Sequence, residues 1–142
     1  MIAAAFAALS GKRSPIRLVA TSRIVTSRPI GPSRRSYANA AAVIETTLTP
    51  PTLLAYLKQI ERAFGRRDSG QRWAARVLDL DIILWSGGIW ASKGLGIPHP
   101  EFAQRSFVLH PAIQIAAKWR DPLTGRTIRQ LRARLDRSRP IA

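Results

Sequence analysis

The sequence contains no cysteine and few acidic residues. Without cysteine, the chain cannot form a disulfide bond, a zinc–thiolate site or a thiol nucleophile. Its 142 residues include 8 acidic side chains against 23 basic ones, which gives a formal net charge of +15. This charge predicts attraction to an anion, and nucleic acid, a nucleotide or an acidic membrane surface would each fit. Nineteen of the basic residues are arginine, which favours phosphate recognition because a planar guanidinium group binds phosphate oxygens in pairs.

Long hydrophobic runs are also absent. No stretch approaches the roughly 18 to 20 apolar residues that a membrane span requires, so we expect no membrane partner. A reducing cytoplasm is compatible with the lack of cysteine, and the cytoplasm is the predicted location. An alternative reading concerns residues 1–44, which contain no acid and seven basic residues. That composition is typical of a mitochondrial transit peptide.

The length and the 46% hydrophobic content predict one domain over residues 1–142. An alanine-rich helix is predicted over Ile2–Leu9, and apolar residues at helical spacing predict a second helix that begins at Thr49 and ends at Gly65. A short apolar helix is expected from Pro111 to Trp119, and a basic tail follows it.

Three runs have the composition of strands. Residues 16–25 and 37–47 are joined by a segment rich in proline and glycine, and residues 77–85 alternate between aliphatic and polar side chains. The order of these elements predicts an α+β fold, in which helices lie on a mainly antiparallel sheet. A ferredoxin-like αβα sandwich would need one more strand at the front, and we expect that first strand to be missing.

The most informative pattern is Leu78-Asp79-Leu80-Asp81-Ile82. Alternate residues of a strand face the same way, so the two carboxylates should point toward one site, with backbones about 6.6 Å apart. Two carboxylates on a rigid element suit Mg²⁺, which binds such groups together with substrate phosphates and water. The alternative is that both aspartates lie on a solvated face and balance nearby arginines.

A basic segment precedes this pattern. Residues 65–76 include four arginines and Trp73, and arginines beside magnesium can stabilise a transferring phosphoryl group. The alternative is a solvated basic loop. No glycine-rich loop that ends in Gly-Lys-Ser/Thr occurs, so a nucleotide site here would not be a P-loop.

Three further residues are candidates with ordinary alternatives. His99, between two prolines, could donate to a phosphate, although a lone histidine is more often structural. Glu61 could equally well cap a helix or pair with an arginine. Phe107 offers a ring for stacking. His110 has no pattern of partners, and we assign it no role.

The combination of these motifs resembles the hydroxymethyl-dihydropterin pyrophosphokinase family. The resemblance is carried by Ile60-Glu61, Gly65-Arg66, Arg72-Trp73, the pattern at 78–82 and Ile97-Pro98-His99-Pro100, with Arg105 and Phe107 following at the family's spacing. Upstream, Pro29-Ile30-Gly31-Pro32 and Tyr37-Ala38-Asn39-Ala40 resemble the loop and strand that bind the pterin.

The resemblance implies transfer of pyrophosphate from ATP to 6-hydroxymethyl-7,8-dihydropterin, with two magnesium ions, by a monomer. It makes Asp79 and Asp81 the metal ligands and, with Arg66 and Arg76, the catalytic residues. The nucleotide side would consist of Leu54, Glu61, Arg72, Trp73, Arg76, Ile82, His99 and Arg105. The pterin side would consist of Ser27, Ile30, Tyr37, Asn39, Asp79 and Phe107.

The sequence departs from the family pattern at several positions. Asp68, Ala74-Ala75 and Pro100 differ from the usual residues. These differences bear on the geometry of the loop and on the reaction rate more than on the family. One alternative is a catalytically impaired fragment of the pyrophosphokinase. The chief alternative function is a basic RNA-binding protein, which accounts for the net charge. It does not account for paired aspartates, which would repel a phosphate backbone, so we expect small-molecule substrates and no nucleic-acid partner.

Overall fold

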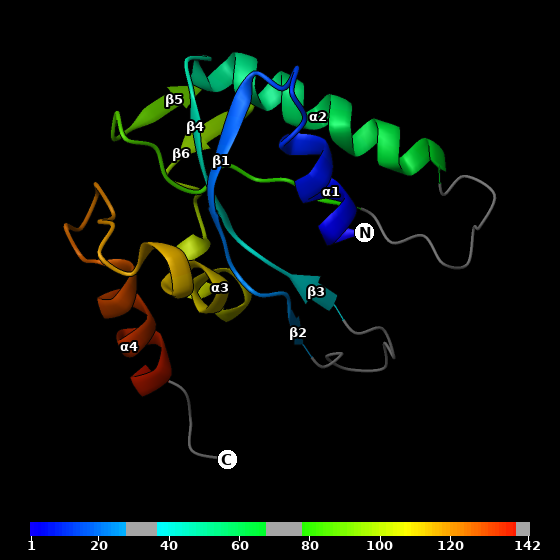
Figure 1. The fold of residues 1–142 in the computed structure, drawn as a ribbon. Helices are drawn as coiled ribbons and strands as arrows, with labels where there is room; N and C mark the ends of the chain where they lie inside the picture. The colour runs from blue at the N-terminus through cyan, green and yellow to red at the C-terminus, as the bar shows by residue number, and fades with distance from the viewer. Residues whose placement is uncertain (28–36, 68–77, 139–142) are drawn as a thin grey trace. The chain divides into compact units, whose positions relative to one another are not determined.

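The computed structural model describes residues 1–27, 37–67 and 78–138, and Figure 1 shows its elements. No helix in these ranges has the length and apolar character that a membrane crossing requires. The helices are α1 (Ile2–Leu9), α2 (Pro50–Arg67), α3 (Ser106–Ala116) and α4 (Ile128–Ser138), with a short 3-10 helix, η2 (Phe102–Gln104).

The described strands form three two-stranded sheets. Strand β1 pairs with β4, while β2 with β3 and β5 with β6 form antiparallel pairs. This mixture of helices and small sheets confirms the predicted α+β class. The ferredoxin-like arrangement and the missing first strand stay predictions. The strands are β1 (Ile16–Thr21), β2 (Val25–Ser27), β3 (Tyr37–Asn39), β4 (Ala42–Thr46), β5 (Trp90–Ser92) and β6 (Leu95–Ile97).

The chain divides into two compact units, and the prediction of a single domain over 1–142 stays a prediction. The first unit comprises residues 1–17 and 46–99, and the second comprises residues 18–45 and 100–142. The first therefore contains α1, α2 and the β5–β6 hairpin, and the second contains β2, β3, η2, α3 and α4.

In the first unit, α1 packs on α2. Ala5 of α1 and Phe64 of α2 are buried in one cluster with Leu78. The short alanine-rich helix has the predicted bounds, and this packing provides the stability that eight residues lack alone.

Helix α2 starts where the sequence predicts but ends later. The carbonyl of Thr49 accepts a hydrogen bond from the backbone N–H of Leu53 at 2.8 Å, as expected of an N-cap residue. The helix continues through Gly65 to Arg67, so the predicted stop at Gly65 is wrong. Glycine favours a helix end only where the chain turns left-handed, and Gly65 does not have a positive φ.

The predicted strand at residues 77–85 is absent over its described part, residues 78–85. The alternation itself is present, because Leu78 is buried and Asp79 and Asp81 are exposed. A strand also needs a neighbour to accept its backbone hydrogen bonds. Here the N–H of Leu80 donates instead to the side chain of Glu61. The segment therefore belongs to no described sheet, although the burial of residues 78–81 alternates.

The first two predicted strands are each interrupted. Residues 22–24 separate β1 from β2, and residues 40–41 separate β3 from β4. Two hydrogen bonds join these two breaks. The buried hydroxyl of Ser22 accepts a hydrogen bond from the N–H of Ala41 at 2.8 Å, and the N–H of Ser22 donates to the carbonyl of Ala41 at 2.8 Å. The serine side chain takes the place of a backbone acceptor.

In the second unit, α3 packs against α4 and against β2 and β3, as Figure 1 shows. The core includes Leu109, which is completely buried, and Ile128. Helix α3 begins at Ser106 and contains Pro111, so the predicted start at Pro111 is wrong. Burial of Leu109, Ala112 and Ala116 on one face outweighs the local preference of proline for a first turn. The basic tail forms α4.

The β5–β6 hairpin was not predicted from the sequence. Its turn is Lys93-Gly94, and Gly94 has a φ of +78°, a conformation that glycine adopts without strain. The hairpin carries Trp90, whose ring meets that of Trp85 edge to face at 5.8 Å.

Candidate functional site

The two aspartates lie on the exposed side of the segment that follows the core residue Leu78. Leu80, between them, packs against the cluster formed by Ala5, Phe64 and Leu78. Because alternate residues of an extended chain point to opposite sides, anchoring Leu78 and Leu80 in the core directs Asp79 and Asp81 to solvent. Both carboxylates are exposed.

Glu61 holds this segment in place from α2. Its Oε2 accepts a hydrogen bond from the N–H of Leu80 at 2.6 Å, and its Oε1 lies 3.1 Å from the Nζ of Lys58. The side chain is 14% exposed, so the bond to Leu80 is shielded from water. Leu80 lies between the two aspartates, so the bond restrains the backbone that carries both of them. The ordinary roles predicted for Glu61 were a helix cap or a pair with an arginine. Among the described residues its partners are instead Leu80 and Lys58.

The donor set at Asp79 and Asp81 fits a hard divalent cation. No residue in the described ranges forms an ion pair with either carboxylate. No group of three or more histidine, aspartate or glutamate side chains in those ranges could hold a metal by itself. Two carboxylates with open coordination positions are what Mg²⁺ uses when substrate phosphates complete its shell. A site that provided a full cage of protein ligands would suit Ca²⁺ better.

A groove lies beside α2 and the β5–β6 hairpin. It has a volume of about 440 Å³ and is lined by Leu54, a predicted nucleotide residue, together with Leu95 of the hairpin. Its cations are Lys58, Arg62 and Lys93. Sequence reasoning missed these residues of the groove. A sequence pattern could have indicated Lys58 and Arg62. They follow Leu54 at intervals of four residues, which puts all three on one helix face.

His99 lies next to the aspartate segment in the same unit. Its N–H donates to the carbonyl of Ile83 at 3.0 Å, and the residue is partly buried. Ile82, which precedes Ile83 in the chain, is also partly buried. The structure therefore brings Ile82, His99 and Glu61 together with the aspartate segment in one unit.

The predicted pterin residues come from the second unit. Tyr37 and Asn39 occupy alternate positions of β3, and Ser27 of β2 is paired with Tyr37. Phe107 is the second residue of α3, the helix that packs against β2 and β3. The Tyr37 and Phe107 side chains are 56% and 43% exposed. Aromatic residues with this exposure can stack on a flat heterocycle.

Arg105 stands at the start of α3 beside Phe107. Its guanidinium carbon lies 5.6 Å from the centre of the Phe107 ring, and its guanidinium group pairs with Glu101. The pairing and the ring contact restrict the orientation of Arg105, one of the predicted nucleotide residues.

Several predicted residues cannot be placed. Ile30, Arg72, Trp73 and Arg76 lie outside the described residues, as do the departures at Asp68 and Ala74-Ala75. Arg66 belongs to the last turn of α2. The roles of all these residues, and of the placed ones, stay predictions.

The sequence of residues 1–117 matches the family model described as 7,8-dihydro-6-hydroxymethylpterin-pyrophosphokinase. The chain belongs to this pyrophosphokinase family. The match includes every predicted site residue, from Ser27 to Phe107.

Individual relatives of the pyrophosphokinase family agree. The chain is similar to the 2-amino-4-hydroxy-6-hydroxymethyldihydropteridine pyrophosphokinases of Synechocystis, at 41% identity over 110 residues, and Haemophilus influenzae, at 43% over 105. A third, from Methylorubrum extorquens, is 37% identical over 124 residues. The alignments cover 78%, 73% and 87% of this chain but only 56%, 65% and 77% of the three relatives, in that order. The chain thus spans less than two thirds of the first two.

Proposed function

We propose that this chain transfers the terminal pyrophosphate of ATP to 6-hydroxymethyl-7,8-dihydropterin and releases AMP, a step of folate biosynthesis. The observation that carries the proposal is the exposed pair Asp79 and Asp81, directed outward by buried neighbours in a chain of this family. A pair of carboxylates without a cationic partner in the described ranges, in a protein of net charge +15, suits a bound metal ion better than a solvated surface.

In the proposed reaction, the hydroxymethyl oxygen of the pterin forms a bond to the β-phosphorus of ATP. The bond between that phosphorus and the oxygen bridging to the α-phosphorus breaks, AMP leaves with that oxygen, and the hydroxyl loses its proton. Catalysis of such a transfer consists mainly of positioning and of electrostatic stabilisation.

The first unit would provide residues for the metal ions and the nucleotide. In the first unit, Asp79 and Asp81 would hold two magnesium ions, which neutralise phosphate charge when bound. Leu54, Ile82 and His99 would bind the nucleotide. Glu61 would help to position the aspartates, because it accepts a hydrogen bond from the backbone of Leu80.

In the second unit, Tyr37 and Phe107 would stack on the pterin, and the Asn39 amide would donate to and accept from its polar edge. Arg105 would neutralise phosphate charge. The arginines Arg66, Arg72 and Arg76 and the stacking residue Trp73 complete the proposal, with Ser27 and Ile30 as further pterin contacts. A monomer working in the cytoplasm remains part of it.

The test is to incubate the 142-residue chain with ATP and to separate the products by chromatography. We expect AMP only when both the pterin and magnesium are present. ADP as the product, AMP formed without the pterin, or no turnover of ATP would each contradict the proposal.

A further inference from the structure

A strongly basic segment follows the part of the chain that matches the family. The match ends at residue 117, and residues 118–138 contain seven cationic side chains and two acidic ones. The acidic ones are Asp121 and Asp136. The cationic ones are Lys118, Arg120, Arg126, Arg129, Arg132, Arg134 and Arg137.

The two acids do little to neutralise these cations. Asp121 is 4% exposed, and its two oxygens accept hydrogen bonds at 2.9 Å from the N–H of Leu123 and the hydroxyl of Thr124. Asp136 lies 3.7 Å from Arg132, whose guanidinium group also lies 3.0 Å from His110. No described residue forms an ion pair with Arg129, Arg134 or Arg137.

The basic residues of α4 are on the face that the fold leaves free. Ile128 and Leu131 are buried, and this side of the helix packs against α3. Arg129, Arg134 and Arg137 are all exposed. Since the apolar face is already covered by α3, α4 cannot insert that face into a lipid surface.

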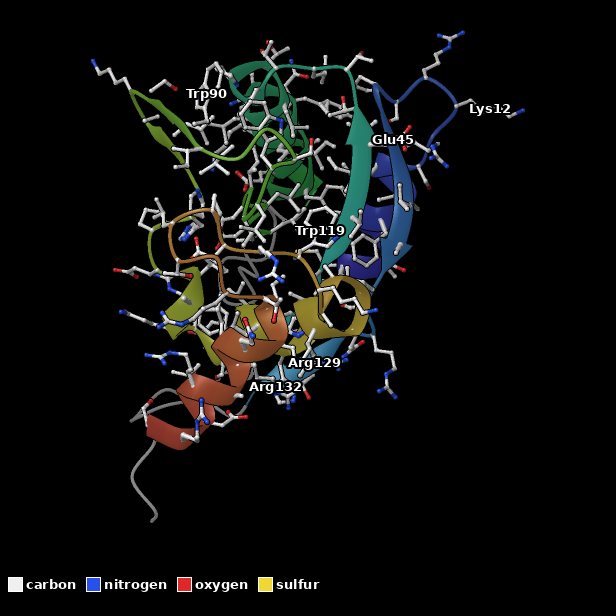
Figure 2. All side chains as sticks on the ribbon, turned by 90° about the vertical axis from the view of Figure 1, so that its left-hand side faces the viewer. Lys12, Glu45, Trp90, Trp119, Arg129 and Arg132 are labelled. Carbon is white, nitrogen blue, oxygen red and sulfur yellow. The ribbon has the colours of Figure 1, made fainter. Side chains whose placement is uncertain are left out.

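A second group of cations adjoins the first turn of α4. The N–H of Arg129 donates to the carbonyl of Ala117 at 3.1 Å, and that of Ile128 donates to Trp119 at 2.9 Å. Lys118 and Arg120 are therefore beside the start of the helix, and both are exposed. Figure 2 labels Trp119, Arg129 and Arg132 in this region. Trp119 is 41% exposed, and its aromatic side chain offers a surface on which a base can stack.

We propose that the surface formed by Lys118, Arg120, Arg129, Arg134 and Arg137 binds the phosphodiester backbone of a nucleic acid without sequence preference. Arg129 and Arg137 are eight positions apart, which is about 12 Å of helix, so one phosphate group cannot contact all of these cations, whereas a chain of phosphates can. The paired aspartates that argue against such binding belong to the other unit. This binding is separate from the proposed transfer reaction.

The experiment measures fluorescence anisotropy of a labelled single-stranded RNA of 20 nucleotides, titrated with the full chain at several salt concentrations. The test variant carries R129Q, R134Q and R137Q. The matched control carries K12Q, R13Q and R23Q, which removes the same charge from exposed residues elsewhere. Arg132 is left unchanged because of its contacts with Asp136 and His110. Circular dichroism checks that both variants keep the native helix content.

We expect the test variant to bind RNA on the order of 10- to 50-fold more weakly at 0.15 M salt. The slope of log affinity against log salt should fall by about 2, since each lost contact with a single strand removes about 0.7. The control should keep the slope of the unmodified chain, and single-stranded DNA should behave as RNA does.

Three outcomes would overturn the proposal. The full chain could fail to bind RNA, or the two variants could lose affinity equally, which would mean attraction by net charge alone. Tight binding to vesicles of phosphatidylserine with weak binding to RNA would assign the surface to a membrane instead.

Discussion

The exposed aspartates of the first unit differ from Glu101, Asp121 and Asp136 of the second in what they contact. In the first, Asp79 and Asp81 are exposed and have no ion-pair partner among the described residues. In the second, Glu101 pairs with Arg105, Asp136 pairs with Arg132, and Asp121 is enclosed in its own turn. In a chain with 23 cations, pairing is the ordinary outcome for an acid. A carboxylate pair that has no ion-pair partner among the described residues is therefore a good candidate for a metal-ligand site.

The largest expected effect tests this difference directly. Asp81→Asn should lower AMP formation about 1,000-fold, because losing a metal ligand removes several kcal/mol of charge stabilisation. Asp136→Asn, the matched change at a paired carboxylate, should leave the rate within about twofold. Both variants should be assayed beside the unmodified chain, with thermal unfolding as the check on folding. Equal rates for the two variants would refute the distinction between the unpaired and the paired carboxylates.

Glu61 gives the second largest effect. Glu61→Ala leaves the shielded N–H of Leu80 without an acceptor, so we expect a loss of about 1 to 3 kcal/mol in the free energy of unfolding. Glu61→Gln retains an oxygen that can accept the bond and should recover most of that loss. Urea denaturation measures both. If Glu61 also positions the aspartates, the magnesium concentration that gives half-maximal AMP formation should be higher in the alanine variant. An unchanged concentration would limit Glu61 to a structural role.

A smaller effect is expected on the pterin side. Tyr37→Ala should raise the KM for the pterin about tenfold, since stacking of one ring on a base contributes roughly 1 to 3 kcal/mol, and should leave the KM for ATP unchanged. Trp119→Ala removes another exposed aromatic residue of the same unit and serves as the control. Steady-state kinetics with each substrate varied in turn measures both KM values. A tenfold rise in the KM for ATP would contradict the assignment of Tyr37 to the pterin side.

Local patterns predicted some of these features and not others. The alanine-rich composition of residues 2–9 predicted α1 with its observed bounds, and alternation predicted that Asp79 and Asp81 share a side, which is exposed. Both depend on residues close in sequence. The strand at 77–85 was wrong because a sheet depends on a neighbouring chain segment, which alternation does not reveal. The bond from Leu80 to Glu61 joins residues 19 positions apart, and only the tertiary packing of α2 brings them together.

The smallest expected effect is on the free energy of unfolding, and it comes from a comparison of two glutamates that both contact a cation. Glu101 pairs with Arg105 across one helical turn, with side chains 60% and 36% exposed, so water screens the attraction and Glu101→Ala should change the free energy of unfolding by less than about 0.5 kcal/mol. Glu61, 14% exposed, should lose several times more on the same substitution. Urea denaturation of the two alanine variants side by side tests this ratio. A loss at Glu101 as large as that at Glu61 would mean that burial of the acceptor does not separate them, and that the bond to Leu80 holds the aspartate segment no more firmly than a surface ion pair would.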